Sequence, residues 1–217
     1  MKRKDSFIKL RDELKKYNKE YYNSKPSIDD SKYDNLKKKY DYLLLKNPEL
    51  VEFDNLGIGT SPSSKFKKFK HYEPMLSLSN SFNFNDSEDF FKKATNFLKR
   101  QNSNYVYYVD CKIDGVSLSL IYKNNKLFKA ITRGDGLIGE EITENVLGII
   151  GIPKVLKNCQ SDLIEIRGEV FFFRKDFEKL NNQFEKKNQF SNPRNAASGS
   201  LRQINSEITK NRPLRFI

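Results

Sequence analysis

One lysine in this chain is placed where it could form a covalent bond. Lys112 opens the run KIDG (residues 112–115), which follows a Tyr- and Val-rich stretch starting at Tyr105 and precedes a stretch of alternating apolar residues, 116–122. This pattern predicts a lysine at the end of a buried strand, just before a glycine that permits a sharp turn. A protonated lysine is a poor nucleophile, so a rigid and partly desolvated setting would be required. A surface lysine in an ordinary hairpin explains most such four-residue runs when they are taken alone.

Two other stretches of the sequence place arginines where they could contact a ligand. Arg133 ends a predicted strand, and the Gly-Asp-Gly sequence after it forms a loop that a backbone or a ligand can approach closely. A plain turn is the alternative. Arg194 and Arg202 bracket the small residues of the stretch 191–203, and guanidinium groups pair well with phosphates.

A third charged group lies within a predicted strand, residues 163–173. Glu165, Arg167 and Glu169 alternate with apolar residues and therefore share one face of that strand. Three charges on one face of an apolar strand are costly unless they face solvent or a ligand cleft. Solvent is the simpler interpretation, but the flanking phenylalanines favour a cleft.

The remaining elements must position these groups. Apolar residues recur at three- and four-residue steps in four predicted helices: 5–22, about 30–47, 87–99 and 175–187. The third helix is expected to bury Phe90, Phe91, Phe97 and Leu98. Asn124 and Asn125 predict a hairpin turn, and strands are predicted for 127–132 and 214–217. The basic stretch 65–70 is interpreted as a linker, and His71 as a structural residue.

Composition limits the classes of function. The 217 residues carry a net charge of +12, which indicates a polyanionic partner, with nucleic acid first; a biased use of Lys and Asn explains the charge equally well. Two cysteines are too few for a disulfide framework or a four-cysteine zinc site. No window could span a bilayer, and the basic start lacks the apolar segment of a signal peptide, so we expect a cytoplasmic protein.

Six blocks of sequence carry a family resemblance. A tyrosine-rich helix is followed by IDDSKYD (28–34), HYEPMLSL (71–78), CKIDG (111–115), TRGDGLIGEEITENV (132–146), IRGEVF (166–171) and NPRNAASGSLRQ (192–203). Together they resemble the N-terminal half of bacterial-type NAD-dependent DNA ligases, and the resemblance runs through almost the whole chain. It implies that Lys112 attacks NAD to form a lysyl-AMP intermediate. The AMP then passes to the 5′-phosphate of a nick in double-stranded DNA, which is sealed in replication and repair.

The resemblance also implies roles for individual residues. Lys112, Asp114 and Glu169 would be catalytic, with Mg²⁺ and NAD as cofactors and the metal ligands left open. Binding of NAD would involve Lys112 and Glu169 together with Tyr21, Tyr22, Asp30, Tyr33, Asp34, Ser77, Leu78, Asp110 and Arg133. The first five of those nine match the patch that holds the nicotinamide mononucleotide half. Arg194 and Arg202 would contact the nucleotide or the nicked DNA.

The expected fold class is α+β. A small helical module with its linker, 1–64, would precede a nucleotidyltransferase (ATP-grasp-like) adenylation domain, 65–217, with antiparallel sheets, flanking helices and an incomplete C-terminus. We expect a monomer that does not seal nicks by itself. Two alternatives stay open: a truncated, non-catalytic remnant that binds NAD or DNA, and an ATP-using nucleotidyltransferase of the same fold. The helical module favours NAD as the donor.

Overall fold

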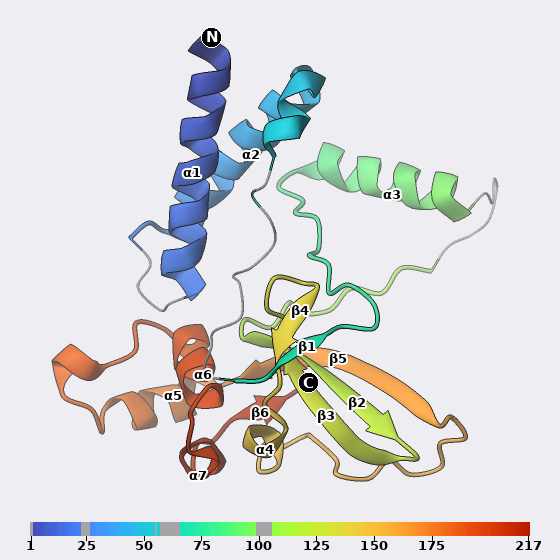
Figure 1. Ribbon diagram of the computed structural model, residues 1–217, viewed down its shortest axis with the longest axis vertical. Helices are drawn as coiled ribbons and strands as arrows, with labels where there is room; N and C mark the ends of the chain where they lie inside the picture. The colour runs from blue at the N-terminus through green and yellow to red at the C-terminus, as the bar shows by residue number, and fades with distance from the viewer. Residues whose placement is uncertain (1, 23–26, 55, 57–65, 99–105) are drawn as a thin grey trace. The chain divides into compact units, whose positions relative to one another are not determined.

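The computed structural model describes residues 2–22, 27–54, 56, 66–98 and 106–217. It divides into two units, Met1–Met75 with Ile113–Ile217, and Leu76–Lys112. Helices occur together with antiparallel sheets (Figure 1), so the predicted α+β class is confirmed. The finer prediction of an ATP-grasp-like domain stays a prediction.

The N-terminal segment is a helical pair. α1 (Lys2–Tyr22) and α2 (Asp30–Lys46) are followed by a short 3-10 helix, η1 (Pro48–Phe53). The Asp29 carboxylate caps α2 by accepting a hydrogen bond from the backbone N–H of Lys32 at 2.8 Å, which satisfies one of the free donors at a helix start. The buried side chains of the pair form a cluster of their own, Phe7, Leu10, Leu14, Tyr40, Leu50 and Leu56. Both predicted helices are therefore confirmed.

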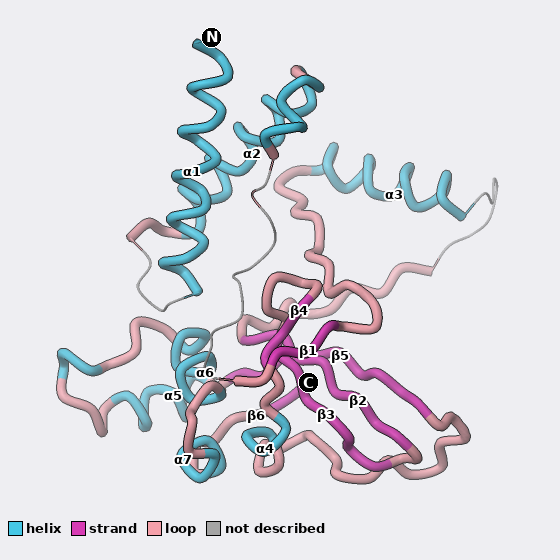
Figure 2. Tube along the Cα trace, in the orientation of Figure 1, coloured by secondary structure: helices cyan, strands magenta, loops and turns pink. Residues whose placement is uncertain are grey.

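A four-stranded antiparallel sheet in the order β3-β2-β5-β6 forms the second part of this unit (Figure 2). Its strands are β2 (Val116–Lys123), β3 (Lys126–Thr132), β5 (Leu163–Phe171) and β6 (Arg215–Phe216). Asn124 and Asn125 connect β2 to β3 with φ angles of 47° and 64°, the left-handed conformation that a two-residue hairpin turn requires. The predicted hairpin is confirmed, as are the strands beginning near residues 163 and 214.

A second, two-stranded sheet corrects one prediction. Lys68–Lys70 forms β1 and pairs antiparallel with β4 (Ile138–Glu140), whereas the sequence suggested a linker. Three residues rich in lysine carry too little periodicity to indicate a strand. The strand forms because the backbone of 138–140, far along the chain, supplies its hydrogen-bond partners.

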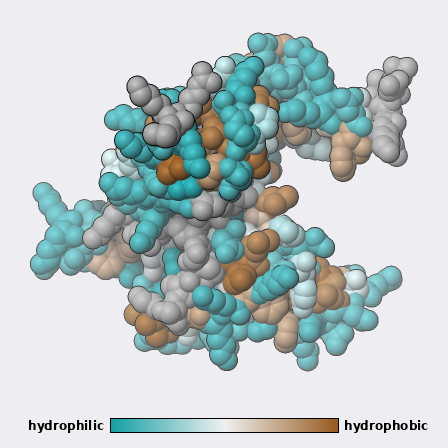
Figure 3. All heavy atoms as spheres, turned by 45° about the horizontal axis from the view of Figure 1, so that its top comes forward, coloured by the Kyte–Doolittle hydropathy of each residue, from teal (hydrophilic) through white to brown (hydrophobic). Residues whose placement is uncertain are grey.

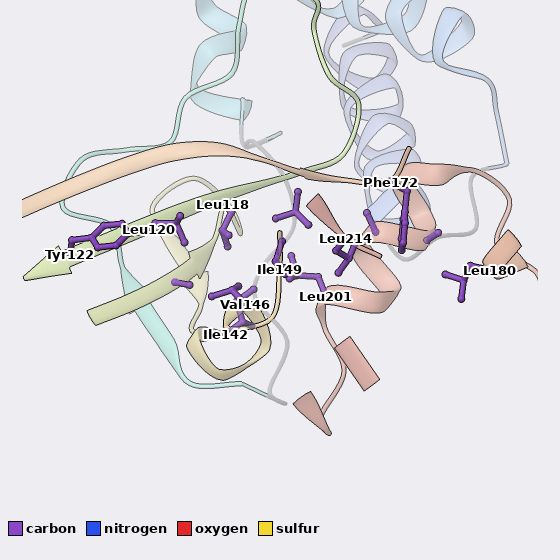
Figure 4. Close-up of a cluster of buried hydrophobic side chains, with 14 residues drawn as sticks. Leu118, Leu120, Tyr122, Ile142, Val146, Ile149, Phe172, Leu180, Leu201 and Leu214 are labelled. Carbon is purple, nitrogen blue, oxygen red and sulfur yellow. The ribbon is translucent and has the colours of Figure 1, made fainter. Parts of the chain in front are cut away.

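The main core lies on one face of the four-stranded sheet. Leu118, Leu120 and Tyr122 of β2 belong to a buried cluster with side chains from α4 (Thr143–Val146) and α6 (Pro193–Leu201). Figure 4 shows Leu118 and Leu120 beside Val146, Ile149 and Leu201. Two further helices complete this part, α5 (Arg174–Asn181) and α7 (Ser206–Lys210), with a short 3-10 helix, η2 (Lys186–Asn188), between them.

The predicted helix 175–187 is too long, because α5 ends at Asn181. The Asn181 side chain donates to the Phe190 carbonyl at 3.0 Å and accepts from the Phe190 N–H at 2.8 Å. These two bonds tie the helix end to the chain nine residues further on. Asparagine is a poor helix former whose amide competes for backbone groups, so the helix stops there.

Replacing Leu118 with alanine should lower the free energy of unfolding by about 3 kcal/mol, because it leaves a cavity in the main core. Leu118 is fully buried (0% exposed), whereas Leu163 on the neighbouring strand β5 is 47% exposed. Leu163→Ala therefore makes the same chemical change without a cavity. Urea unfolding of both variants tests this, and equal losses would contradict the assignment of the core.

The unit Leu76–Lys112 departs from prediction in two respects. Its helix α3 (Phe84–Leu98) matches the predicted one, but none of its residues is buried, so the predicted burial of Phe90, Phe91, Phe97 and Leu98 is wrong. A helix buries its apolar face only where another element packs on it, and the described residues of this unit supply no second helix or strand. Within the unit, the Phe91 ring contacts Tyr107 at a centroid distance of 4.5 Å.

The strand predicted to lead into Lys112 is also absent among the described residues, because 106–114 have no regular secondary structure. A run rich in strand-forming residues becomes a strand only when another backbone pairs with it, and none of the described strands pairs with this segment. The space-filling view shows mostly hydrophilic residues on one face, interrupted by small hydrophobic groups (Figure 3).

Candidate active site

The first predicted site residue that the structure places firmly is Glu169. The register pairs Ser117 of β2 with Glu169 of β5, so the two side chains emerge on the same face of the sheet. Glu169 accepts a hydrogen bond from the Ser117 hydroxyl at 2.9 Å and another from the Gly115 N–H at 3.2 Å. The carboxylate therefore holds the backbone at the point where the KIDG run enters β2.

Gly115 is required at this point for steric reasons. A Cβ atom on this residue would lie 2.1 Å from the Val170 carbonyl oxygen and 3.1 Å from the Glu169 Cγ. Only glycine allows the start of β2 to approach β5 so closely. The glycine of the KIDG run is therefore required by backbone packing.

Gly115→Ala is expected to lower the free energy of unfolding by about 1–3 kcal/mol, because the new methyl group overpacks against backbone atoms. Displacing the residues next to Lys112 should also slow reaction at that lysine by about tenfold or more. Gly148→Ala is the comparison variant with a milder clash, since a Cβ there would lie 3.0 Å from the Lys210 Cγ and 3.2 Å from its Cα, against 2.1 Å from a carbonyl oxygen at Gly115. Thermal unfolding and the rate of covalent modification measure the two effects. Wild-type behaviour of Gly115→Ala in both would refute the steric argument.

Arg194 pairs with Asp114 on the same side of this turn. The Arg194 Nη1 donates to the Asp114 Oδ1 at 2.9 Å, although the two residues are 80 positions apart. The Asp114 side chain is 68% exposed and that of Arg194 is 21% exposed, so the carboxylate is open to solvent while the arginine stem is held. The structure brings together a predicted catalytic residue and a predicted DNA-contacting residue.

Arg194 is held by helix α6, which sequence reasoning described only as a stretch of small residues. The side chain of Asn192 caps this helix by accepting from the Asn195 N–H at 2.7 Å, and Pro193 occupies its first turn. An asparagine before a proline is a recognised helix start, so the signal was present in the sequence. Ala196, Ala197 and Leu201 of the same helix are buried in the main core, which fixes the helix on the sheet.

Arg133 stands at the start of a tight loop, as predicted. Gly134 and Gly136 have φ angles of 59° and 91°, which favour glycine, and the Asp135 carboxylate accepts from the N–H groups of Leu137 and Ile138 at 2.9 and 2.8 Å. The buried ring of His71 lies with Nε2 3.2 Å from the Arg133 carbonyl oxygen. This contact agrees with the structural role expected for His71.

Glu165, Arg167 and Glu169 form the charged face of β5, and two of them, Glu165 and Arg167, pair with each other. Glu165 accepts from Arg167 Nε at 2.8 Å and from the buried Ser119 hydroxyl at 2.7 Å. Burial alone would raise the pKa of Glu165, but the hydrogen bonds from Arg167 and Ser119 outweigh it and hold the pKa below the usual glutamate value. The carboxylate is therefore ionised at neutral pH.

Arg202 pairs with a different carboxylate, that of Glu140. Its Nη2 donates to the Glu140 Oε1 at 2.9 Å, and its Nε lies 2.7 Å from the Glu140 Oε2. Glu140 is almost completely buried, with 3% of its side chain exposed, so this pair joins β4 to the end of α6. Sequence reasoning identified Arg202 but not the buried carboxylate that it neutralises.

The predicted residues of the unit Leu76–Lys112 are Ser77, Leu78, Asp110 and Lys112, and all four are exposed. The Asp110 carboxylate accepts a hydrogen bond from the Cys111 N–H at 2.7 Å. Lys112 is the last residue of its unit, and only Ile113 separates it from Asp114. Lys112 therefore lies two positions along the chain from Asp114, which pairs with Arg194.

The predicted residues of the helical pair lie at the facing ends of its two helices. Tyr21 and Tyr22 are the last residues of α1, and Asp30 is the first of α2. Tyr33, one turn into α2, packs partly against the helical core, and Asp34 beside it is half-buried. All five residues therefore lie near the end of the helical pair where α1 ends and α2 begins.

A metal-ion site formed by protein side chains alone is not found in the described part of the chain, where no group of three or more His, Cys, Asp or Glu residues gathers. The same residues include no helix whose length and apolar character would let it cross a membrane.

Two known protein families together match residues 2–217 of this chain. Residues 63–217 match the family described as NAD-dependent DNA ligase adenylation domain, and residues 2–64 match a DNA ligase-like, N-terminal NAD+-binding domain. Similar proteins named "DNA ligase" occur in Wolbachia sp. subsp. Brugia malayi (42% identical over 98% of this chain and 30% of the relative), Fusobacterium nucleatum (43%, 97% and 31%) and Pelagibacter ubique (45%, 97% and 31%). The chain thus spans 30–31% of the length of these relatives. The chain belongs to the NAD-dependent DNA ligase family.

Proposed function

We propose that this chain carries out the adenylation step of an NAD-dependent DNA ligase, with Lys112 as the nucleophile. The unprotonated Nζ attacks the adenylyl phosphorus of NAD, a P–N bond forms, and the P–O bond to nicotinamide mononucleotide breaks. The amine gives up one proton, and nicotinamide mononucleotide leaves with its own phosphate. The observation that carries the proposal is the turn after Lys112, where Glu169 and Arg194 hold Gly115 and Asp114.

Phosphoryl transfer of this kind depends on positioning and charge neutralisation. Asp114 and Glu169 would contribute the carboxylates for Mg²⁺, an ion commonly held by one or two carboxylates together with substrate phosphate oxygens. The exposed Asp114 carboxylate fits that donor set. When bound, the metal would neutralise charge on the phosphate groups.

The remaining site residues divide by the part of the ligand that they would contact. We propose that Ser77, Leu78, Asp110 and Arg133 contact the adenylate half of NAD. The end of the helical pair would bind the nicotinamide mononucleotide half through Tyr21, Tyr22, Asp30, Tyr33 and Asp34. The match of residues 2–64 to an NAD+-binding domain supports this division.

The acceptor of the adenylyl group would be the 5′-phosphate at a nick in double-stranded DNA, during replication and repair. Arg194 and Arg202 are the candidate contacts, and the net charge of +12 favours a polyanionic partner. The fold would be the nucleotidyltransferase (ATP-grasp-like) type, and the protein a cytoplasmic monomer. The pairing of Arg194 with Asp114 supports a DNA contact close to the proposed site of adenylation.

The donor distinguishes this proposal from an ATP-using enzyme. The protein is incubated with Mg²⁺ and either NAD or ATP, and its intact mass is measured. One added adenylyl group with NAD and none with ATP is the expected result. Modification by ATP alone would overturn the choice of donor. If the protein binds NAD but forms no adduct, it is a binding module and not a catalyst of adenylation.

A further inference from the structure

The charged face of β5 holds a segment that has no assigned role. Residues 71–75, which we call the strap, follow β1 directly and run beside the Arg133 loop, residues 133–137. The His71 N–H donates to the Leu137 carbonyl and the Met75 N–H donates to the Gly136 carbonyl, both at 2.9 Å. A Cβ on Gly136 would lie 3.1 Å from the Met75 carbonyl oxygen, so strap and loop are closely packed.

Arg167 attaches the strap to the sheet. Its Nη1 donates to the Pro74 carbonyl at 2.9 Å, and its Nη2 donates to the Glu73 carbonyl at 2.6 Å. Its Nε is held by Glu165, which Ser119 holds in turn. All three kinds of guanidinium nitrogen are therefore used at once. The planar fork of arginine can bridge two carbonyls and a carboxylate, whereas a lysine ammonium acts as a point charge.

The hydrogen bonds form a continuous chain from β5 to Arg133. Arg167 holds the strap, Met75 and His71 of the strap hold the loop, and His71 Nε2 lies 3.2 Å from the Arg133 carbonyl oxygen. His71 is 5% exposed, so water does not readily replace this contact. Movement of the strap would therefore move Arg133.

We infer that Arg167 is a positioning residue for nucleotide binding: it sets the place of Arg133 by clamping the strap. This inference rests on the proposed function only for the identity of the ligand, since the contacts of Arg167 with residues 73, 74 and 165 do not depend on it. Arg167 touches strap carbonyls and Glu165 in these contacts, so its effect on NAD should be indirect. The effect should therefore depend on Arg133 being present.

The first test measures the clamp without NAD. In Arg167→Gln, hydrogen exchange of the His71 and Met75 amides should become about tenfold faster, because the strap loses two of its bonds to the sheet. Arg174→Gln is the matched control, because Arg174 is a highly exposed arginine that also pairs with a glutamate, Glu178. Exchange in Arg167→Gln equal to that in the control would overturn the inference.

The second test measures NAD. Arg167→Gln should raise the dissociation constant for NAD about tenfold, and Arg167→Lys should fall between it and wild type, with thermal midpoints close to that of the control. In an Arg133→Gln background, Arg167→Gln should have little further effect, because positioning through Arg133 makes the two losses non-additive. Additive losses, or an unchanged dissociation constant, would show that Arg167 does not act through Arg133.

The two tests separate the inference from the proposed function. If the wild-type protein binds no NAD, the proposed function fails and the role of Arg167 in nucleotide binding fails with it, even where exchange shows the clamp. If wild type binds NAD and Arg167→Gln changes neither exchange nor affinity, the inference alone fails.

Discussion

Lys112→Ala should produce no adenylated protein at any NAD concentration, because it removes the only atom proposed to form the bond to phosphorus. Lys112→Arg should be equally inactive, since a guanidinium stays protonated and is no nucleophile at neutral pH. Intact mass after incubation with NAD and Mg²⁺ gives the result directly, and peptide mapping of the wild-type adduct locates the bond.

The control for this result is another exposed lysine. Lys123 ends β2 and its Nζ lies 4.2 Å from the centroid of the Phe128 ring, so Lys123→Ala removes an amine from the same strand without touching the turn at Gly115. This variant should be adenylated like wild type. An adduct of undiminished yield in Lys112→Ala would assign the chemistry to a different residue.

Arg202→Ala should lower the free energy of unfolding by about 3–5 kcal/mol, because the buried Glu140 carboxylate loses the charge that neutralises it. Glu140 has 3% of its side chain exposed, so water cannot take over the role of the guanidinium. Denaturant unfolding at neutral pH measures the loss. Arg174→Ala should change stability by less than about 1 kcal/mol, because its pair with Glu178 is exposed.

A double variant separates charge burial from lost packing. Adding Glu140→Gln to Arg202→Ala removes the buried charge that Arg202 neutralised and should restore part of the stability. If Arg202→Ala alone unfolds like wild type, the pair has no structural role, and the residue is left only with the DNA contact proposed from the family. A loss of stability would require DNA-binding data on this variant to be corrected for folding.

Local signals in the sequence predicted the elements that depend on neighbours in the chain. The helical pair follows from its apolar spacing and from the Asp29 cap, and the hairpin follows from Asn124 and Asn125. The stretch 106–114 shows the limit of such signals: it is rich in Tyr and Val, yet it is not a strand in the described structure. Periodicity states which face a strand would present, but a partner decides whether the strand forms.

The candidate site was predicted residue by residue but not as an arrangement. Lys112, Asp114, Glu169 and Arg194 all came from motifs, while the Asp114–Arg194 bond and the grip of Glu169 on Gly115 join residues 80 and 54 positions apart. Pairings at such distances depend on how the chain folds back on itself. Arg167 was noted only as one of three charges, because its two carbonyl partners in the strap carry no signature in the sequence.

The pairing of β2 with β5 has a consequence for how this protein folds. The register that places Glu169 opposite Ser117 also places Val170 opposite Val116, so one alignment decides the polar face and the core face together. A slip of one residue would turn Glu165, Arg167 and Glu169 towards the apolar cluster. Misaligned molecules therefore cannot accumulate as stable but inactive protein. During biosynthesis, molecules with the wrong register would remain unfolded and would be bound by chaperones or degraded by proteases.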